Sequence, residues 1–198
     1  MKFYLFLLIT SFHVFNGLAQ EWKLKKDKNG IKVYTRTLDS TKIHEYKAVM
    51  IIDIPIEKVY ETITDGDNIW IWNYRTSASK VLKKYADGEF ILWMSNNLPW
   101  PIRDRDHISL VKTITNNKGE VRIDILPKPS YNFPAKKGVI RITNFKGYWL
   151  IVPKPEGVEV TQQMYGDPEG ALAPWLVNTM LSNGAYHSFF NLKQLLEN

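Results

Sequence analysis

The stretch Tyr165–Asn178, "YGDPEGALAPWLVN", marks the point where the sequence changes from strands to one long helix. Beyond it, apolar residues recur at i, i+4, i+7 and i+11: Ala185, Phe189, Leu192 and Leu196. This spacing predicts a helix over residues 174–197, roughly 36 Å long at 1.5 Å per residue. The first half of this helix is apolar on more than one side, so it must be covered on more than one side or line a cavity.

Upstream of this point the sequence predicts strands at close spacing. One short helix interrupts them after Pro55, where apolar residues recur at i, i+3, i+4 and i+7. The strands are expected near residues 30–36, 43–54, 78–85, 89–95, 105–115, 120–126, 138–145, 147–152 and 157–165. Short turns join antiparallel neighbours, so the predicted class is α+β. We expect a curved antiparallel sheet of about eight or nine strands wrapped around the long C-terminal helix, with an internal hydrophobic cavity.

Composition limits the chemistry that the chain can perform. Of its 198 residues, 44% are hydrophobic and 13% aromatic, which is enough for a sizeable core. There is no cysteine, so stability must come from packing, and thiol nucleophiles and thiolate metal sites are excluded. No repeat or linker divides residues 20–198, which are expected to form one domain.

Residues 1–19, "MKFYLFLLITSFHVFNGLA", have the pattern of a secretory signal peptide cleaved after Ala19. Lys2 supplies the basic start, and small residues flank Leu18. The alternative is a retained anchor, but the apolar run is shorter than the roughly 20 residues that span a bilayer. Export predicts a periplasmic or secreted protein, in keeping with a bacterial source.

The excess of positive charge is modest. There are 26 basic and 20 acidic residues, spread along the chain without a dense basic stripe or a nucleic-acid motif. Nucleic-acid binding is therefore not expected. Two interpretations remain, ordinary solvation of the lysines or a mild attraction to an anionic membrane surface.

Five motifs occur in an order that is more specific than any one of them alone. They are "GIKVYTR" (30–36), "IEKVYETITD" (56–65) followed by Trp72 and Asn73, "RDRDHISL" (103–110), "KGYWLIVPKPEGVEVT" (146–161) and "YGDPEGALAPWLVN" (165–178). In order and spacing the chain resembles the steroidogenic-acute-regulatory-related lipid-transfer (START) domains from Trp22 to about Leu196. The resemblance implies a helix-grip fold, in which the sheet wraps a lipid tunnel closed by the C-terminal helix and nearby loops.

This resemblance gives a role to the loop Asn97–Ile102, "NLPWPI". Two prolines prevent it from pairing as a central strand. It would lie at the tunnel mouth, with Leu98, Trp100 and Ile102 as gate residues able to touch a bilayer and Arg103 near phosphate headgroups. The alternative is that Trp100 caps the core.

Arg105 matches the arginine of the family's "RD" motif, which in some members reaches into the cavity. If so, strand alternation places Arg105, His107, Ser109 and Val111 on the inward face, while Asp106, Ile108 and Leu110 point the other way. A buried Arg needs a partner, but the preceding strand, "FILWMS" (90–95), carries no acid. A ligand phosphate or carboxylate or a distant acid could complete it. Alternatively, Arg105 is a surface residue paired with Asp104.

The other expected ligand contacts are mostly aromatic. They are Trp93, Trp149, Tyr165, Trp175, Asn178 and Phe189. Since a shift of one residue swaps the faces of a strand, the sequence does not separate cavity walls from core.

The predicted function is binding of a lipid or other hydrophobic ligand, with transfer between membranes, by a monomeric protein that is not an enzyme. No zinc-binding or hydrolase motif occurs, and no cofactor or metal is expected. The "GDPEG" run at 166–170 lacks the glycine pattern of a phosphate loop. Two alternatives remain: a cyclase-like cavity enzyme using His107 as acid or base, or a module that binds a partner or membrane with its cavity filled. Which lipid is bound is left open.

Overall fold

The computed structural model describes residues 21–198. The predicted signal peptide, residues 1–19, lies outside the described residues. Within residues 21–198 the structure has ten strands, two α-helices and one short 3-10 helix. In chain order they are β1 (Lys23–Lys28), β2 (Ile31–Leu38), β3 (Thr41–Ile52), α1 (Ile56–Thr64), η1 (Ile69–Ile71), β4 (Thr76–Lys84), β5 (Phe90–Asn96), β6 (Arg105–Thr115), β7 (Val121–Pro127), β8 (Ile140–Ile142), β9 (Phe145–Lys154), β10 (Gly157–Gly166) and α2 (Pro174–Glu197).

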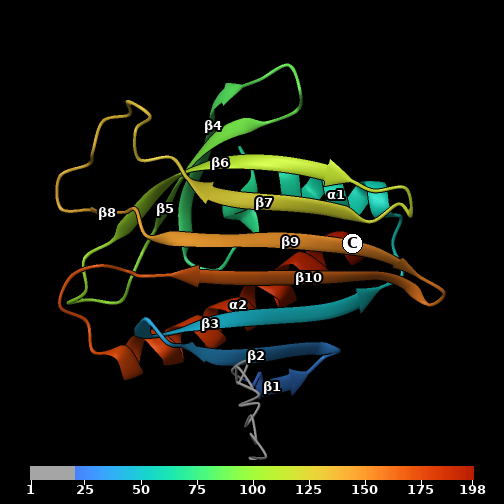
Figure 1. Ribbon diagram of the computed structural model, residues 1–198, viewed down its shortest axis with the longest axis horizontal. Coiled ribbons are helices and arrows are strands. Elements are labelled where there is room, and N and C mark those ends of the chain that lie inside the picture. Colours follow the sequence, from blue (N-terminus) through green and yellow to red (C-terminus); the bar gives the residue numbers. More distant parts are fainter. Residues whose placement is uncertain (1–20) are drawn as a thin grey trace, which may run out of the picture.

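The strands form one sheet in the order β1-β2-β3-β10-β9-β7-β6-β5-β4 (Figure 1). All neighbours on this path are antiparallel. The predicted fold class, an antiparallel sheet with a long C-terminal helix, is confirmed.

Two details differ from the prediction. β1 was not expected, because "KLKKDK" reads as a charged cluster; it is an edge strand, where lysines are common since they discourage pairing with another chain. The strand expected over residues 138–145 is only β8, and it pairs with the start of β6 in parallel.

Helix α2 crosses one face of the sheet (Figure 1). The main hydrophobic core contains buried residues of both the helix and the sheet. At the centre, the ring of Trp149 stacks on Phe189 at 5.4 Å, and the ring of Trp72 meets Trp149 edge-on at 5.9 Å. All three side chains are buried. This aromatic cluster fills the space beneath the middle of the helix.

Polar contacts fix the position of α2 on the sheet. Asn178 accepts a hydrogen bond from the backbone N–H of His44 in β3 at 2.8 Å. Further along the helix, Ser188 Oγ accepts one from the N–H of Tyr74 at 3.0 Å. The helix is thereby tied to the sheet on one side and to the loop before β4 on the other.

The opposite face of the sheet carries a second apolar cluster. Ile91, Trp93 and Ile108 are buried there beneath the segment between β7 and β8, which contributes Tyr131 and Phe133. Strand β5 is consequently buried on both faces.

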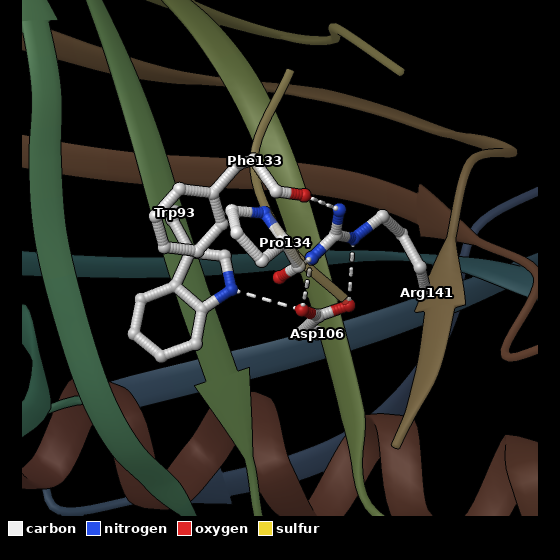
Figure 2. A network of polar contacts seen from close by, with 5 residues as sticks. All are labelled: Trp93, Asp106, Phe133, Pro134 and Arg141. Carbon is white, nitrogen blue, oxygen red and sulfur yellow. Dashed lines mark hydrogen bonds and ion pairs between the residues drawn. The ribbon is translucent and has the colours of Figure 1, made fainter. Parts of the chain in front are cut away.

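A polar network joins this segment to β6 (Figure 2). The carboxylate of Asp106 accepts hydrogen bonds from Arg141 at 2.7 and 3.0 Å and from the indole N–H of Trp93 at 2.9 Å. Arg141 also donates to the backbone carbonyls of Phe133 and Pro134. Desolvation opposes ionisation of Asp106, but the hydrogen bonds from Arg141 and Trp93 outweigh it and lower the pKa of the carboxyl.

Neither helix of residues 21–198 has both the length and the apolar run that crossing a bilayer requires.

Candidate functional site

A cavity of about 410 Å³ lies between the sheet, helix α2 and three loops. Its volume falls in the range of roughly 300–1,000 Å³ that small-molecule sites occupy. The sheet contributes Tyr46, His107, Ile125, Ile142, Phe145, Met164 and Tyr165. Helix α2 contributes Val177, Met180, Leu181, Asn183, Gly184, Ala185 and Ser188. The remaining wall comes from residues in the segments 73–75, 96–99 and 166–172, together with Arg105 at the start of β6.

The cavity exists because large rings fill only part of the concave face. The cluster of Trp72, Trp149 and Phe189 occupies the space under the centre of α2. Next to it the helix presents Gly184, which has no side chain, and Ala185, which has only a methyl group, and this leaves room. A Cβ atom added at Gly184 would meet no heavy atom within 4 Å.

Strand β6 alternates between the cavity and the outer face of the sheet. Arg105 and His107 line the cavity. Asp106 and Ile108, between and after them, belong to the outer face. The alternation predicted for this strand is therefore observed.

Arg105 is a buried cation, with 4% of its surface exposed. Its guanidinium donates to the backbone carbonyls of Pro168 at 2.8 Å, Glu169 at 2.9 Å and Arg103. These bonds use three of the five N–H groups of an arginine. The expected alternative of a surface Arg paired with Asp104 is wrong, because Arg105 is buried and its side-chain hydrogen bonds go to main-chain oxygens.

The "GDPEG" run supplies two of these carbonyl groups. Its backbone is held in shape by Asp167, which accepts from the N–H of Glu169 at 2.9 Å. The Glu169 carboxylate turns away from Arg105 and accepts two bonds from Thr143, both at 3.0 Å. The run thus presents main-chain oxygen atoms to Arg105 instead of N–H groups to a phosphate.

Desolvation lowers the pKa of Arg105, and the nearby charge of Arg103 acts in the same direction, while Glu169 and Asp104 oppose it. The usual value is high enough that the side chain remains a cation at neutral pH.

His107 is held neutral inside the cavity wall. Its Nδ1 lies 2.9 Å from Ser109 Oγ, and its ring lies 5.0 Å from the ring of Phe145. Desolvation lowers the pKa of His107 to about 4, against a smaller opposing effect of Asp106. At neutral pH this side chain adds no charge to the cavity.

The mouth of the cavity is framed by two loops that contact each other. The N–H of Asn97 donates to the carbonyl of Arg75 at 2.8 Å. Leu98 and Pro99 line the cavity, whereas Trp100 is 92% exposed. Of the two interpretations of Trp100, the structure excludes the plug over the core.

The structure brings together four of the predicted site residues. Leu98, Arg105, His107 and Tyr165 all line the cavity. Ser109 is fully buried behind His107, and Asn178 holds α2 to β3 without facing the cavity. Ile102 is partly buried in the mouth loop and Arg103 is exposed.

The other predicted aromatic contacts lie elsewhere. Trp93 lies on the outer face of the sheet. The sequence could not show this, because β5 is apolar on both faces and its residues do not alternate between polar and apolar. Trp149 and Phe189 are core residues stacked on each other. Trp175 is 70% exposed at the start of α2.

Several cavity residues were not predicted from the sequence. The most informative are Tyr46, Asn73, Arg75 and Asn96, which add polar groups to a mostly apolar wall. Tyr46 donates to Gln162 at 2.7 Å, and burial raises its pKa. The alternation of β3 could have indicated that Tyr46 faces inward with Ala48 and Met50. Arg75 lies in an irregular loop, where no periodicity indicates the direction of a side chain.

Among residues 21–198, no group of three or more His, Asp or Glu side chains is placed to hold a metal ion.

A curved sheet gripping a C-terminal helix around a cavity defines a helix-grip protein. The sequence model of the START domain matches residues 16–198. An uncharacterised protein of Pseudomonas aeruginosa is 30% identical over 92% of this chain and 90% of its own length. The phosphatidylcholine transfer protein of Rattus norvegicus is 25% identical over 83% of this chain and 78% of its own. A crystal structure of a STAR-related lipid transfer protein from Xanthomonas axonopodis has 29% identity and a TM-score of 0.82, over 89% of this chain and 99% of that one.

The chain belongs to the START domain family.

Proposed function

We propose that this protein binds a lipid in the cavity between the sheet and α2 and carries it between membranes. The observation that carries the proposal is a cavity of about 410 Å³ with a largely apolar wall and a few polar groups. Membership of the START family and its similarity to lipid transfer proteins support the same function.

Binding would be driven by removal of the ligand's apolar surface from water, worth about 25 cal/mol per Å². Ile125, Phe145, Met164 and Leu181 offer apolar surface for its chains. Arg105, with two N–H groups not used by the backbone carbonyls, is placed to hold a polar end.

Exchange of the ligand would require the mouth loop to move away from α2. Leu98 and Pro99 line the cavity from this loop, and Met180 and Leu181 line it from the helix. The exposed rings of Trp100 and Trp175 are suited to the interfacial zone of a bilayer, where Trp is favoured. Contact with a membrane would open the gate at the place where the lipid must leave.

Several features favour binding over catalysis. His107 is the one imidazole in the wall formed by residues 21–198, and its neighbour Ser109 is fully buried behind it. A nucleophilic Ser–His pair would need that hydroxyl to face the ligand. We therefore propose a carrier and not a cavity enzyme.

The signal-like residues 1–19 support export, so the proposed place of action is the periplasm or the exterior of a bacterial cell.

The direct test is lipid transfer between vesicles. Donor vesicles contain a self-quenched fluorescent phospholipid and acceptor vesicles contain none. We expect the purified chain to accelerate dequenching in proportion to its concentration, because each molecule carries lipid across water. No acceleration with vesicles of any headgroup would refute transfer.

A further inference from the structure

We propose that the cavity selects an amphiphile whose polar end bears a net negative charge, a phosphate or a carboxylate, held between Arg75 and Arg105. This inference rests on the proposed lipid-binding function and specifies its ligand class. The observation behind it is the positive charge of the two arginines in the cavity wall.

The charged side chains in the wall are all cationic. Among the cavity-lining residues that the structure describes are two arginines, Arg75 and Arg105, and no Asp, Glu or Lys. His107 is neutral at physiological pH. The wall therefore carries two positive charges that the wall itself does not balance, and an anionic ligand gains from both.

Both arginines lie at the same end of the sheet. Arg75 directly precedes β4, and Arg105 begins β6. Between these strands lies the end of β5, where Asn96 pairs with Thr76 on one side and with Arg105 on the other. Asn96 also lines the cavity, so a polar group at this end would meet two guanidinium groups and an amide.

Nearby acids do not neutralise Arg105 by contact. Glu169 bonds to Thr143, and Asp104 accepts from the N–H of Leu98 at 3.0 Å. Across residues 21–198, no carboxylate forms an ion pair with Arg75 or Arg105. A buried cation bonded only to carbonyl groups is incompletely compensated, and a charged ligand oxygen would complete it.

The backbone at Arg75 gives an independent indication that its side chain matters. Its φ is 60°, in the left-handed region that favours glycine. Its side chain is exposed at the mouth and lies 5.2 Å over the ring of Tyr74, which stacks on His187 at 4.8 Å. A residue kept in a conformation that glycine would adopt more readily is a candidate for a functional side chain.

The test is a competition within one vesicle. Vesicles of equimolar dioleoyl-phosphatidylglycerol and dioleoyl-phosphatidylcholine are incubated with the full chain, the protein is separated by size, and its bound lipid is extracted and quantified. Because both lipids share one surface, attraction of the basic protein to the vesicle cannot bias the ratio. We expect the anionic lipid to be enriched about tenfold, the factor given by about 1.4 kcal/mol.

Arg75→Gln should reduce this enrichment to about twofold or less without lowering the unfolding midpoint, since the side chain is exposed. Arg75→Gly should do the same with an equal or higher midpoint, because glycine relieves the strained backbone. The matched control is Lys80→Gln, which removes the same charge from an exposed position of β4 outside the cavity and should keep the wild-type ratio.

Two further arms distinguish the source of the anion. Added oleate should displace the phospholipid if a carboxylate serves as well as a phosphate, and inorganic phosphate should not displace it, since it lacks apolar chains. A ratio near one between bound phosphatidylglycerol and bound phosphatidylcholine would overturn the inference while leaving lipid binding intact. An effect of Lys80→Gln on this ratio equal to that of Arg75→Gln would do the same. Inorganic phosphate bound without any lipid would also overturn it. Absence of any bound lipid would instead count against the proposed function.

Discussion

Asp106 and Arg141 form an ion pair at 2.7 Å on the outer face of the sheet, one residue from the cavity-lining Arg105. The pair joins β6 to β8 and, through the carbonyls of Phe133 and Pro134, holds the covering segment in place. Strand β6 thus points Arg105 into the cavity, and the next residue, Asp106, fixes the strand to Arg141 on the outer face.

Asp106→Asn should destabilise the protein by about 3 kcal/mol, because it leaves Arg141 without its counter-charge in a largely buried setting. Urea unfolding at pH 7 measures this change. The matched control is Asp124→Asn, which breaks the more exposed Arg122–Asp124 pair of 2.8 Å and should cost less than about 1 kcal/mol. Equal costs for the two variants would show that the Asp106 pair has no anchoring role.

Stability should fall between pH 7 and pH 4.5 because of His107. Its pKa is about 4 in the folded protein, against an ordinary value of 6.5 in an unfolded chain, so the unfolded chain binds the proton first as the pH falls. The stabilisation is therefore complete above pH 6.5 and is lost progressively towards pH 4. The loss should be about 2 kcal/mol at pH 4.5.

Urea unfolding of the wild type and of His107→Gln at pH 7, 5.5 and 4.5 isolates this effect. The two proteins should differ in slope, with the variant falling less steeply over this range. Burial and the nearby Lys25 and Lys23 also lower the pKa of His44, so His44 adds a loss that is common to both proteins. Parallel slopes would show that His107 does not titrate with a lowered pKa. Asp106 does not interfere, since its pKa is lowered and its own loss of stability falls mainly below the ordinary aspartate pKa of 3.8.

Trp100→Ser should slow lipid transfer without affecting the fold. Burying even a third of the roughly 200 Å² of a Trp side chain in a bilayer is worth about 1.7 kcal/mol, or more than tenfold in membrane affinity. Because the Trp100 side chain is 92% exposed, its replacement should change the free energy of unfolding by less than about 0.5 kcal/mol. The control is Ile114→Ser, which removes an exposed apolar residue at the opposite end of β6. An unchanged transfer rate in Trp100→Ser would argue against membrane contact by this loop.

Gly184→Ala should stabilise the protein by about 0.5–1 kcal/mol, raising the unfolding midpoint by about 1–4 °C. Alanine suits a helix interior better, and the added Cβ projects into open space. Gly66→Ala should do the reverse, since its Cβ would come within 2.7 Å of Val81. Destabilisation by Gly184→Ala would mean that the helix needs glycine there and that the cavity does not reach it.

The elements that could be predicted from the sequence are those whose two faces differ in polarity or burial. Strand β6 places Arg105 and His107 on one side and Asp106 on the other, so its alternation could be read directly. Helix α2 shows its apolar spacing over its second half, where Phe189 and Leu192 are fully buried.

The missed parts depend on contacts that are distant in sequence. Trp93 was misplaced because the segment carrying Phe133 covers the outer side of β5, which makes both of its faces apolar. The partner of Asp106 lies 35 positions away, on a strand of three residues. Arg75 lines the cavity from a loop whose backbone is bonded to Asn97, more than 20 positions away in the sequence.

The most direct test of the central claim is mass spectrometry of an organic extract from the protein purified without detergent, compared with the variant Gly184→Phe. The phenyl ring would occupy the open space beside Gly184 and fill the cavity from α2 without disturbing the aromatic core. We expect a stoichiometric lipid in the wild type that is absent from an equally well folded Gly184→Phe. A wild-type protein that is folded and carries no lipid, even after incubation with vesicles, would contradict it.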